Sequence, residues 1–162
     1  MTSPADFTQI LSTLAAHNVK FIVVGGISAV LNGAPVTTFD IDIVHDRSAE
    51  NIRQLVAALE QLNTYYRTHP NQRIAPTAKQ LAGPGHQLLM TDAGPLDVLG
   101  ALGESKFDDL LKDSTLFEIH DLPSVYVLNL SRLISLKEST GREKDLAVLP
   151  VLRRTLEEQG RS

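Results

Sequence analysis

The chain of 162 residues has the length of one domain, and its 43% hydrophobic and 21% charged residues are those of an ordinary globular protein. No apolar run approaches the ~20 residues of a membrane span, and the lack of cysteine excludes disulfides and thiolate metal sites, which favours a cytoplasmic protein. A net charge of −4 argues against a broad nucleic-acid-binding surface, and five scattered histidines without helical ligand spacing argue against zinc.

The first part of the chain alternates between helical and strand patterns. Apolar residues at helical spacing predict a helix in residues 4–18, and "VKFIVVGG" (19–26) predicts a short buried strand that ends in two glycines. A helix of about two turns follows in "ISAVLNG" (27–33), and then a second strand in "TTFDIDIVH" (37–45). Residues 48–63 predict a longer helix with Ser48 as its N-cap.

The second part begins with a stretch rich in proline, glycine and polar residues (64–85), which predicts a loop with short pieces of strand or helix. A hairpin is expected in residues 86–102, with its turn at 92–95, and a short helix in residues 105–113. A second hairpin-like pair (115–129) precedes two closing helices separated near Gly141. This order predicts an α/β (α+β) fold with a mixed sheet and helices packed against it.

Two aspartates interrupt the apolar second strand. Asp40 and Asp42 are separated by one residue, so their side chains should point to the same side of an extended chain. Two carboxylates this close repel each other, and removal from water adds to the cost, so we expect a cation to hold them. His45 should lie on the opposite face, and we leave it out of the candidate site.

Context gives this Asp-x-Asp pair its meaning, because a chain with eleven aspartates contains about one such pair by chance. Gly25 and Gly26 lie just upstream and allow a ligand to approach the backbone closely. Ser28 either bonds a phosphate oxygen or is an ordinary serine at a helix start. Asp97, in "PLDVL", either joins the site or lies exposed on an edge strand. Three carboxylates beside a phosphate-binding turn suit two-magnesium phosphoryl chemistry.

Charge is also unevenly distributed along the chain. Residues 61–91 contain no aspartate or glutamate, only Arg67, Arg73, Lys79 and two histidines. This basic stretch is either a solvated loop or a surface that meets phosphate groups.

The segment "GGISAVLNGAPVTTFDIDIV", with "PLDVLG" downstream, resembles the nucleotidyltransferase superfamily typified by DNA polymerase β. Within it, the chain is most similar to small bacterial nucleotidyltransferases related to the AbiEii toxins of type IV toxin–antitoxin systems. It shares with them the later segment "LISLKESTGREKDL". The resemblance covers about residues 19–150 and implies a polymerase-β-like fold, with residues 1–162 forming a single nucleotidyltransferase domain.

The resemblance assigns the nucleotide's triphosphate to Gly25, Gly26 and Ser28, and adds Lys137 as a further phosphate contact. The alternative for Lys137 is a solvated helix face.

The same resemblance assigns divalent metal ions, Mg²⁺ or Mn²⁺, to Asp40, Asp42 and Asp97, and has Asp97 help to take the proton from the attacking hydroxyl. It implies transfer of an NMP group from an NTP to an acceptor hydroxyl, on a tRNA end or on a partner protein of a toxin–antitoxin system. The alternative is a non-catalytic nucleotide-binding or interaction module of the same fold. The intact set of three aspartates argues against that alternative.

Overall fold

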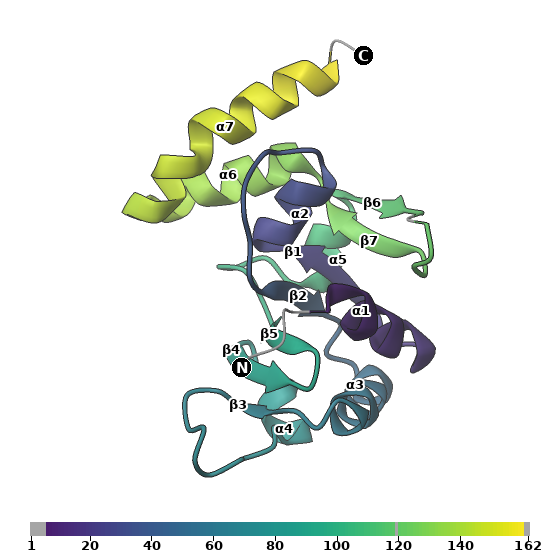
Figure 1. The fold of residues 1–162 in the computed structure, drawn as a ribbon. Coiled ribbons are helices and arrows are strands. Elements are labelled where there is room, and N and C mark those ends of the chain that lie inside the picture. Colours follow the sequence, from purple (N-terminus) through teal and green to yellow (C-terminus); the bar gives the residue numbers. More distant parts are fainter. Residues whose placement is uncertain (1–5, 119, 161–162) are drawn as a thin grey trace.

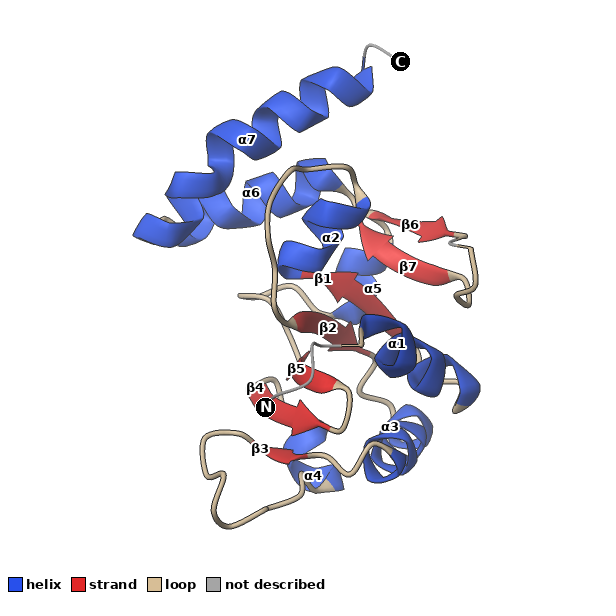
Figure 2. Cartoon of the chain, in the orientation of Figure 1, coloured by secondary structure: helices blue, strands red, loops and turns tan. Residues whose placement is uncertain are grey.

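The computed structural model describes residues 6–118 and 120–160, which form a seven-stranded sheet flanked by helices (Figure 1 and Figure 2). The strands are β1 (Phe21–Val24), β2 (Ile41–His45), β3 (Tyr65–Tyr66), β4 (His86–Thr91), β5 (Gly94–Leu99), β6 (Ser114–Phe117) and β7 (Val125–Leu128). The helices are α1 (Phe7–Ala16), α2 (Gly25–Leu31), α3 (Ala49–Gln61), α4 (Ala78–Leu81), α5 (Phe107–Leu111), α6 (Leu130–Thr140) and α7 (Glu143–Gly160).

The predicted elements are largely confirmed. Helix α1 begins after Asp6, whose carboxylate accepts a hydrogen bond from the backbone of Gln9, while Pro4 and Ala5 of the predicted helix lie outside the described residues. Ser48 caps α3 as predicted, since its side chain accepts from the Asn51 backbone N–H. Both predicted hairpins form, as the antiparallel pairs β4–β5 and β6–β7.

Two predicted boundaries are wrong. Strand β2 begins at Ile41, so Asp40 lies in a bend just before the strand instead of inside it. Helix α2 begins at Gly25, so both glycines are helical residues and not a turn before the helix. Gly25 has a φ of +69°, which turns the chain out of β1 immediately after Val24, so the last pair between β1 and β2 is Val24 with Asp42.

The strand order is β3-β4-β5-β2-β1-β7-β6, so β1, β2 and β5 lie in the interior of the sheet. Strand β2 runs parallel to β5, and β1 runs parallel to β7, while the other pairs are antiparallel. The sheet is therefore mixed, as predicted. Because β5 lies between β4 and β2, Asp97 is not an exposed residue of an edge strand.

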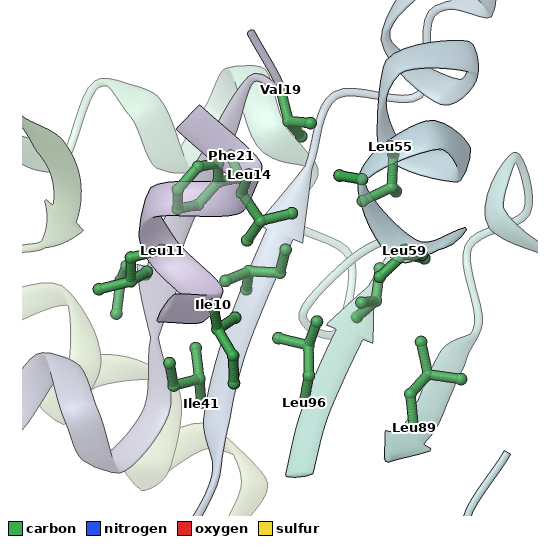
Figure 3. Close-up of a cluster of buried hydrophobic side chains, with 14 of the residues drawn as sticks. Ile10, Leu11, Leu14, Val19, Phe21, Ile41, Leu55, Leu59, Leu89 and Leu96 are labelled. Atoms are coloured by element: carbon green, nitrogen blue, oxygen red, sulfur yellow. The ribbon is translucent and has the colours of Figure 1, made fainter. Parts of the chain in front are cut away.

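The two faces of the sheet carry separate apolar cores. On one face, side chains of α1 and α3 pack on the strands, as Figure 3 shows for Ile10, Leu14 and Leu55 near Ile41 and Leu96. The other core joins the sheet to α2, α5, α6 and α7, and its strand residues are Ile22, Val24, Val44, Leu99 and Leu128. Since side chains alternate along a strand, Asp42 shares this second face with its neighbour Val44.

His45 lies on the first face, with Ile41 and Ile43, as the sequence predicts. Its side chain is buried, and its Nε2 atom is 2.7 Å from the carbonyl oxygen of Leu81. Burial lowers the pKa of the imidazole, which keeps it neutral. His45 therefore belongs to the packing of α4 against the sheet and not to the aspartate site.

Helices α6 and α7 meet at Gly141, which ends α6 in a left-handed conformation with a φ of +62°. Buried leucines at positions 133, 149 and 152 fix this helix pair to the second face of the sheet. None of the helices in the described part of the chain has the length and apolar character to cross a bilayer.

Candidate active site

Two of the predicted site aspartates face each other across neighbouring strands. Asp42 pairs in register with Asp97 across the parallel β2–β5 ladder, and with Val24 across the antiparallel β1–β2 ladder. Residues paired in this way are about 5 Å apart and project from the same face of a sheet. Asp40 precedes β2 by one residue, so the three predicted carboxylates gather at one end of the sheet.

The glycine corner lies directly against the Asp42 carboxylate. Gly25 follows Val24 with a left-handed φ of +69°, and a Cβ atom at this position would overlap with Oδ2 of Asp42. A Cβ atom at Gly26 would lie 2.8 Å from Oγ1 of Thr38, which is closer than real side chains approach. Only glycine fits this close passage of α2 beside the carboxylates.

One open cavity of about 750 Å³ joins these features. Six of the seven predicted site residues line it: Gly25, Gly26, Asp40, Asp42, Asp97 and Lys137. The opposite wall comes from α6, the connection after it and the start of α7. It adds Arg142, Lys144 and Asp145, while Arg67 and His86 line the cavity near β4. The cavity thus has a carboxylate wall facing a wall that carries cations.

Ser28 is the predicted site residue that the structure places elsewhere. Its side chain is fully buried and does not line the cavity. Its hydroxyl donates a hydrogen bond of 2.6 Å to the carbonyl oxygen of Gly25, one helical turn earlier. Serine hydroxyls commonly bond back to their own helix in this way, so Ser28 fixes the first turn of α2 and does not face a ligand.

The cation that the clustered carboxylates require is Arg67, which follows β3. Its Nη1 atom lies 2.5 Å from Oδ1 of Asp97, and its Nη2 atom lies 3.9 Å from Oδ2 of Asp40. Burial lowers the pKa of the guanidinium, but the hydrogen bond to Asp97 and the three aspartate charges outweigh burial and raise it. Sequence reasoning did not single out Arg67, and its only signals were the basic stretch and the expected need for a cation.

Asp42 carries the electrostatic cost of the cluster. Burial raises its pKa, and the charge of Asp97, a hydrogen bond with Asp97 and the charge of Asp40 raise it further, to about 7. Arg67 lowers this pKa without cancelling the other effects. The site therefore holds more negative charge than its own cation compensates near neutral pH.

A buried carboxylate organises the cationic wall. Asp145, at the start of α7, accepts from Nζ of Lys137 at 3.2 Å, from Nε of Arg142 at 2.8 Å and from Oγ1 of Thr140 at 2.9 Å. Burial alone would raise the pKa of Asp145, but these hydrogen bonds lower it, so the carboxylate stays ionised. Lys137 is thus held at the cavity by an ion pair, which excludes the alternative of a freely solvated helix face.

The residues suit a divalent metal ion by their donor chemistry. Mg²⁺ and Mn²⁺ prefer carboxylate oxygens, and three aspartates with excess negative charge offer them. Within residues 6–118 and 120–160, however, no three carboxylate or imidazole groups are already arranged around a common point. In the same cluster, the guanidinium of Arg67 engages Oδ1 of Asp97, an oxygen that a metal ion would use.

Comparison with known proteins gives two similarities. Residues 6–83 match the aminoglycoside-2''-adenylyltransferase family, a range that includes the glycine corner, Asp40, Asp42 and Arg67 but ends before Asp97. The crystal structure of a proposed nucleotidyltransferase from Thermotoga maritima superposes with a TM-score of 0.56 over 93% of this chain and 89% of that one, at 21% sequence identity. No curated protein matches the sequence.

These similarities bear differently on the predictions. The structural match confirms the predicted nucleotidyltransferase fold. Neither similarity extends to the AbiEii-like group, so the narrower resemblance is not supported. The family match over residues 6–83 and the structural match together support a nucleotidyltransferase, the class of enzyme that the sequence resemblance implies.

Proposed function

We propose that this protein transfers an NMP group from an NTP to an acceptor hydroxyl in a reaction that depends on Mg²⁺ or Mn²⁺. The observation that carries the proposal is the in-register pair of Asp42 and Asp97 beside a corner that only glycine fits. Both lie in one cavity with Asp40 and face a cationic wall. In a triphosphate with bound metal ions, the positive metal ions complement the carboxylate wall and the negative phosphates complement the cationic wall.

The carboxylate wall would hold the metal ions through Asp40, Asp42 and Asp97. When bound, such ions offset the charge of the triphosphate and lower the pKa of a coordinated hydroxyl. The pKa of about 7 at Asp42 supports this role, because a cation that relieves the charge repulsion favours the ionised carboxylate.

The opposite walls would hold the phosphates. The backbone of Gly25 and Gly26 faces the cavity without side chains, so phosphate oxygens can approach it closely. Lys137 of α6 and Arg142, which lies between α6 and α7, face the same cavity, and Asp145 fixes their positions. Ser28 would act only indirectly, through the carbonyl of Gly25.

In the transfer step, the acceptor oxygen attacks the α-phosphorus and forms a new P–O bond. The bond from the α-phosphorus to the bridging oxygen of the β-phosphate breaks, and pyrophosphate leaves with that electron pair. The proton of the acceptor hydroxyl passes to the Asp97 carboxylate and from there to solvent. In the structure, Arg67 engages Oδ1 of this carboxylate.

Three acceptor classes follow from the resemblances. The sequence resemblance to AbiEii-like toxins suggests a tRNA end or a hydroxyl on a partner protein of a toxin–antitoxin system, in the cytoplasm where NTPs are made. The family that matches residues 6–83 acts, by its name, on the 2'' position of an aminoglycoside. The described structure favours none of the three, so the acceptor is assigned by experiment.

The test is label transfer from each of the four α-³²P-NTPs to total tRNA, to an aminoglycoside panel and to candidate partner proteins. Asp97→Asn should slow transfer by about 100-fold or more while leaving nucleotide affinity within a few-fold, since a positioned proton acceptor acts mainly in the transition state. Asparagine retains an oxygen for Arg67, so the variant should fold. Transfer at the parent rate would remove Asp97 from the reaction, and no transfer by the parent to any acceptor would favour the non-catalytic binding module.

A further inference from the structure

Arg67 is anchored beside the carboxylates by the backbone of β4. Its own N–H donates to the carbonyl of Leu88 at 3.2 Å, and its Nη1 atom donates to the carbonyl of Leu89 at 3.0 Å. The side chain then reaches Asp97 and, more distantly, Asp40. This arrangement places one guanidinium at the carboxylate wall from the residue that follows β3, in a stretch where the sequence predicts a loop with short pieces of strand or helix.

The charge balance of the cavity makes this guanidinium decisive. Among the described residues, Arg67 is the sole cation within ion-pair distance of Asp40 or Asp97. The other cations of the cavity wall that form ion pairs, Lys137 and Arg142, are engaged by Asp145. Arg67 therefore provides the local compensation for three aspartates, and the Asp97 side chain is only 15% exposed, so solvent screens the pair weakly.

A metal ion and the guanidinium would compete for the same atom. Oδ1 of Asp97 accepts Nη1 of Arg67 at hydrogen-bonding distance. A divalent ion coordinates a carboxylate oxygen at about 2.0–2.2 Å and repels a neighbouring cation. Coordination by this oxygen therefore requires the guanidinium to move away from Asp97.

We propose that Arg67 is the internal counter-ion of the carboxylate site and sets its affinity for divalent cations, which bind by displacing the guanidinium from Asp97. This inference rests on the proposed function, since it concerns the metal ions that the function requires. It adds that the chain carries its own competitor for the metal ion. The metal concentration needed for binding then depends on Arg67 as well as on the aspartates.

The experiment is calorimetric titration of Mn²⁺ into the full chain without nucleotide, for the parent and for Arg67→Gln. Loss of the competing charge should tighten Mn²⁺ binding by about 5- to 30-fold, the scale of a partly buried ion pair with a charged hydrogen bond. Arg73→Gln is the matched control, because Arg73 belongs to the same loop but stacks on the Tyr65 ring, 4.5 Å from its centroid. The Mn²⁺ affinity of Arg73→Gln should stay within about twofold of that of the parent. This variant loses a cation of the same loop, but one that forms none of the ion pairs found among the described residues.

The outcomes separate this inference from the proposed function. Equal or weaker Mn²⁺ binding by Arg67→Gln, at a site that Asp42→Asn abolishes, would overturn the role of Arg67 and leave the metal site standing. No Mn²⁺ binding by the parent and by Arg67→Gln would overturn the metal site itself.

A second measurement uses the parent alone and does not depend on the folding of a variant. When Mg²⁺ is titrated into the parent, the Arg67 Nε–Hε signal in NMR spectra should shift. The shift should reach its end point at the same Mg²⁺ concentration at which a Mg²⁺ binding isotherm saturates. A signal that stays unchanged at saturating Mg²⁺ contradicts displacement.

Discussion

Replacing Asp42 by asparagine should stabilise the metal-free protein at alkaline pH. Burial, and then the charge of Asp97, raise the pKa of this carboxyl from its ordinary value of 3.8 to about 7. A carboxyl whose pKa is raised by folding stabilises the folded state fully below pH 3.8, and this contribution is lost as the pH rises through 7. The parent should therefore lose stability between pH 4 and pH 8, whereas an amide of the same shape does not ionise.

The size of the effect follows from the two pKa values. The difference between 3.8 and about 7 corresponds to an upper limit of roughly 4 kcal/mol in the free energy of unfolding at pH 8. Movement of Arg67 and entry of water reduce this limit, and we expect a gain of about 2 kcal/mol for Asp42→Asn. For a chain of this length, that corresponds to a rise in Tm of about 4–8 °C.

The assay is urea and thermal unfolding of both proteins in EDTA at pH 5, 6, 7 and 8. The gain should grow from pH 5 to pH 7 and level off towards pH 8, because the two pKa values are 3.8 and about 7. Asp145→Asn is the opposite control: hydrogen bonds lower the pKa of Asp145 despite its burial, so its contribution is present above pH 3.8 and its loss should destabilise the protein at pH 8. A variant Asp42→Asn that is less stable than the parent at pH 8, or shows the same pH slope, would refute the assignment of uncompensated charge.

Two further predictions concern the walls of the cavity. Gly25→Ala should lower Tm more than Gly103→Ala. Both residues have a left-handed φ (+69° and +58°), but only a side chain at Gly25 meets Asp42. Equal losses of Tm in melting curves would show that the close approach is unimportant. Lys137→Met should weaken NTP binding by about tenfold in calorimetry while leaving Mn²⁺ affinity nearly unchanged. The reason is that Lys137 contacts Asp145 and not the carboxylate wall. A matching loss of Mn²⁺ affinity would contradict the division of the cavity into two walls.

The elements of the fold were predictable where the determining interactions are local. Helix caps such as Ser48, apolar periodicity and hairpin turns act within a few residues, and the structure confirms them. The start of β2 was not predictable in this way. It depends on pairing with strands elsewhere in the chain: the pairs with β1 end at Asp42, and Ile41 joins the sheet by pairing with Leu96 of β5.

The candidate site was predictable in part for a related reason. Alternation along β2 places Asp42 on the sheet face opposite to that of Ile41 and Ile43. The apolar strand pattern "PLDVL", read together with the upstream motif, singled out Asp97, which is far along the chain but adjacent in the sheet. Ser28 lies away from the cavity lining because a helix-start serine has a local alternative partner, and in the structure its hydroxyl bonds the Gly25 carbonyl. Sequence position alone does not decide between a ligand and that carbonyl.

For Arg67, the sequence predicted that a cation is needed but not which residue supplies it. Close carboxylates require a cation, and that requirement followed from Asp40 and Asp42 alone. Its identity depends on the carbonyls of Leu88 and Leu89, which hold Arg67 beside Asp97 although thirty positions separate the two residues. Two variants then measure the same charge imbalance: Asp42→Asn through the stability that it gains, and Arg67→Gln through the metal affinity that it gains. If the first variant is stabilised and the second does not bind Mn²⁺ more tightly, the imbalance is real but Arg67 does not compete with the metal ion, and Asp42 alone sets the cost of the site.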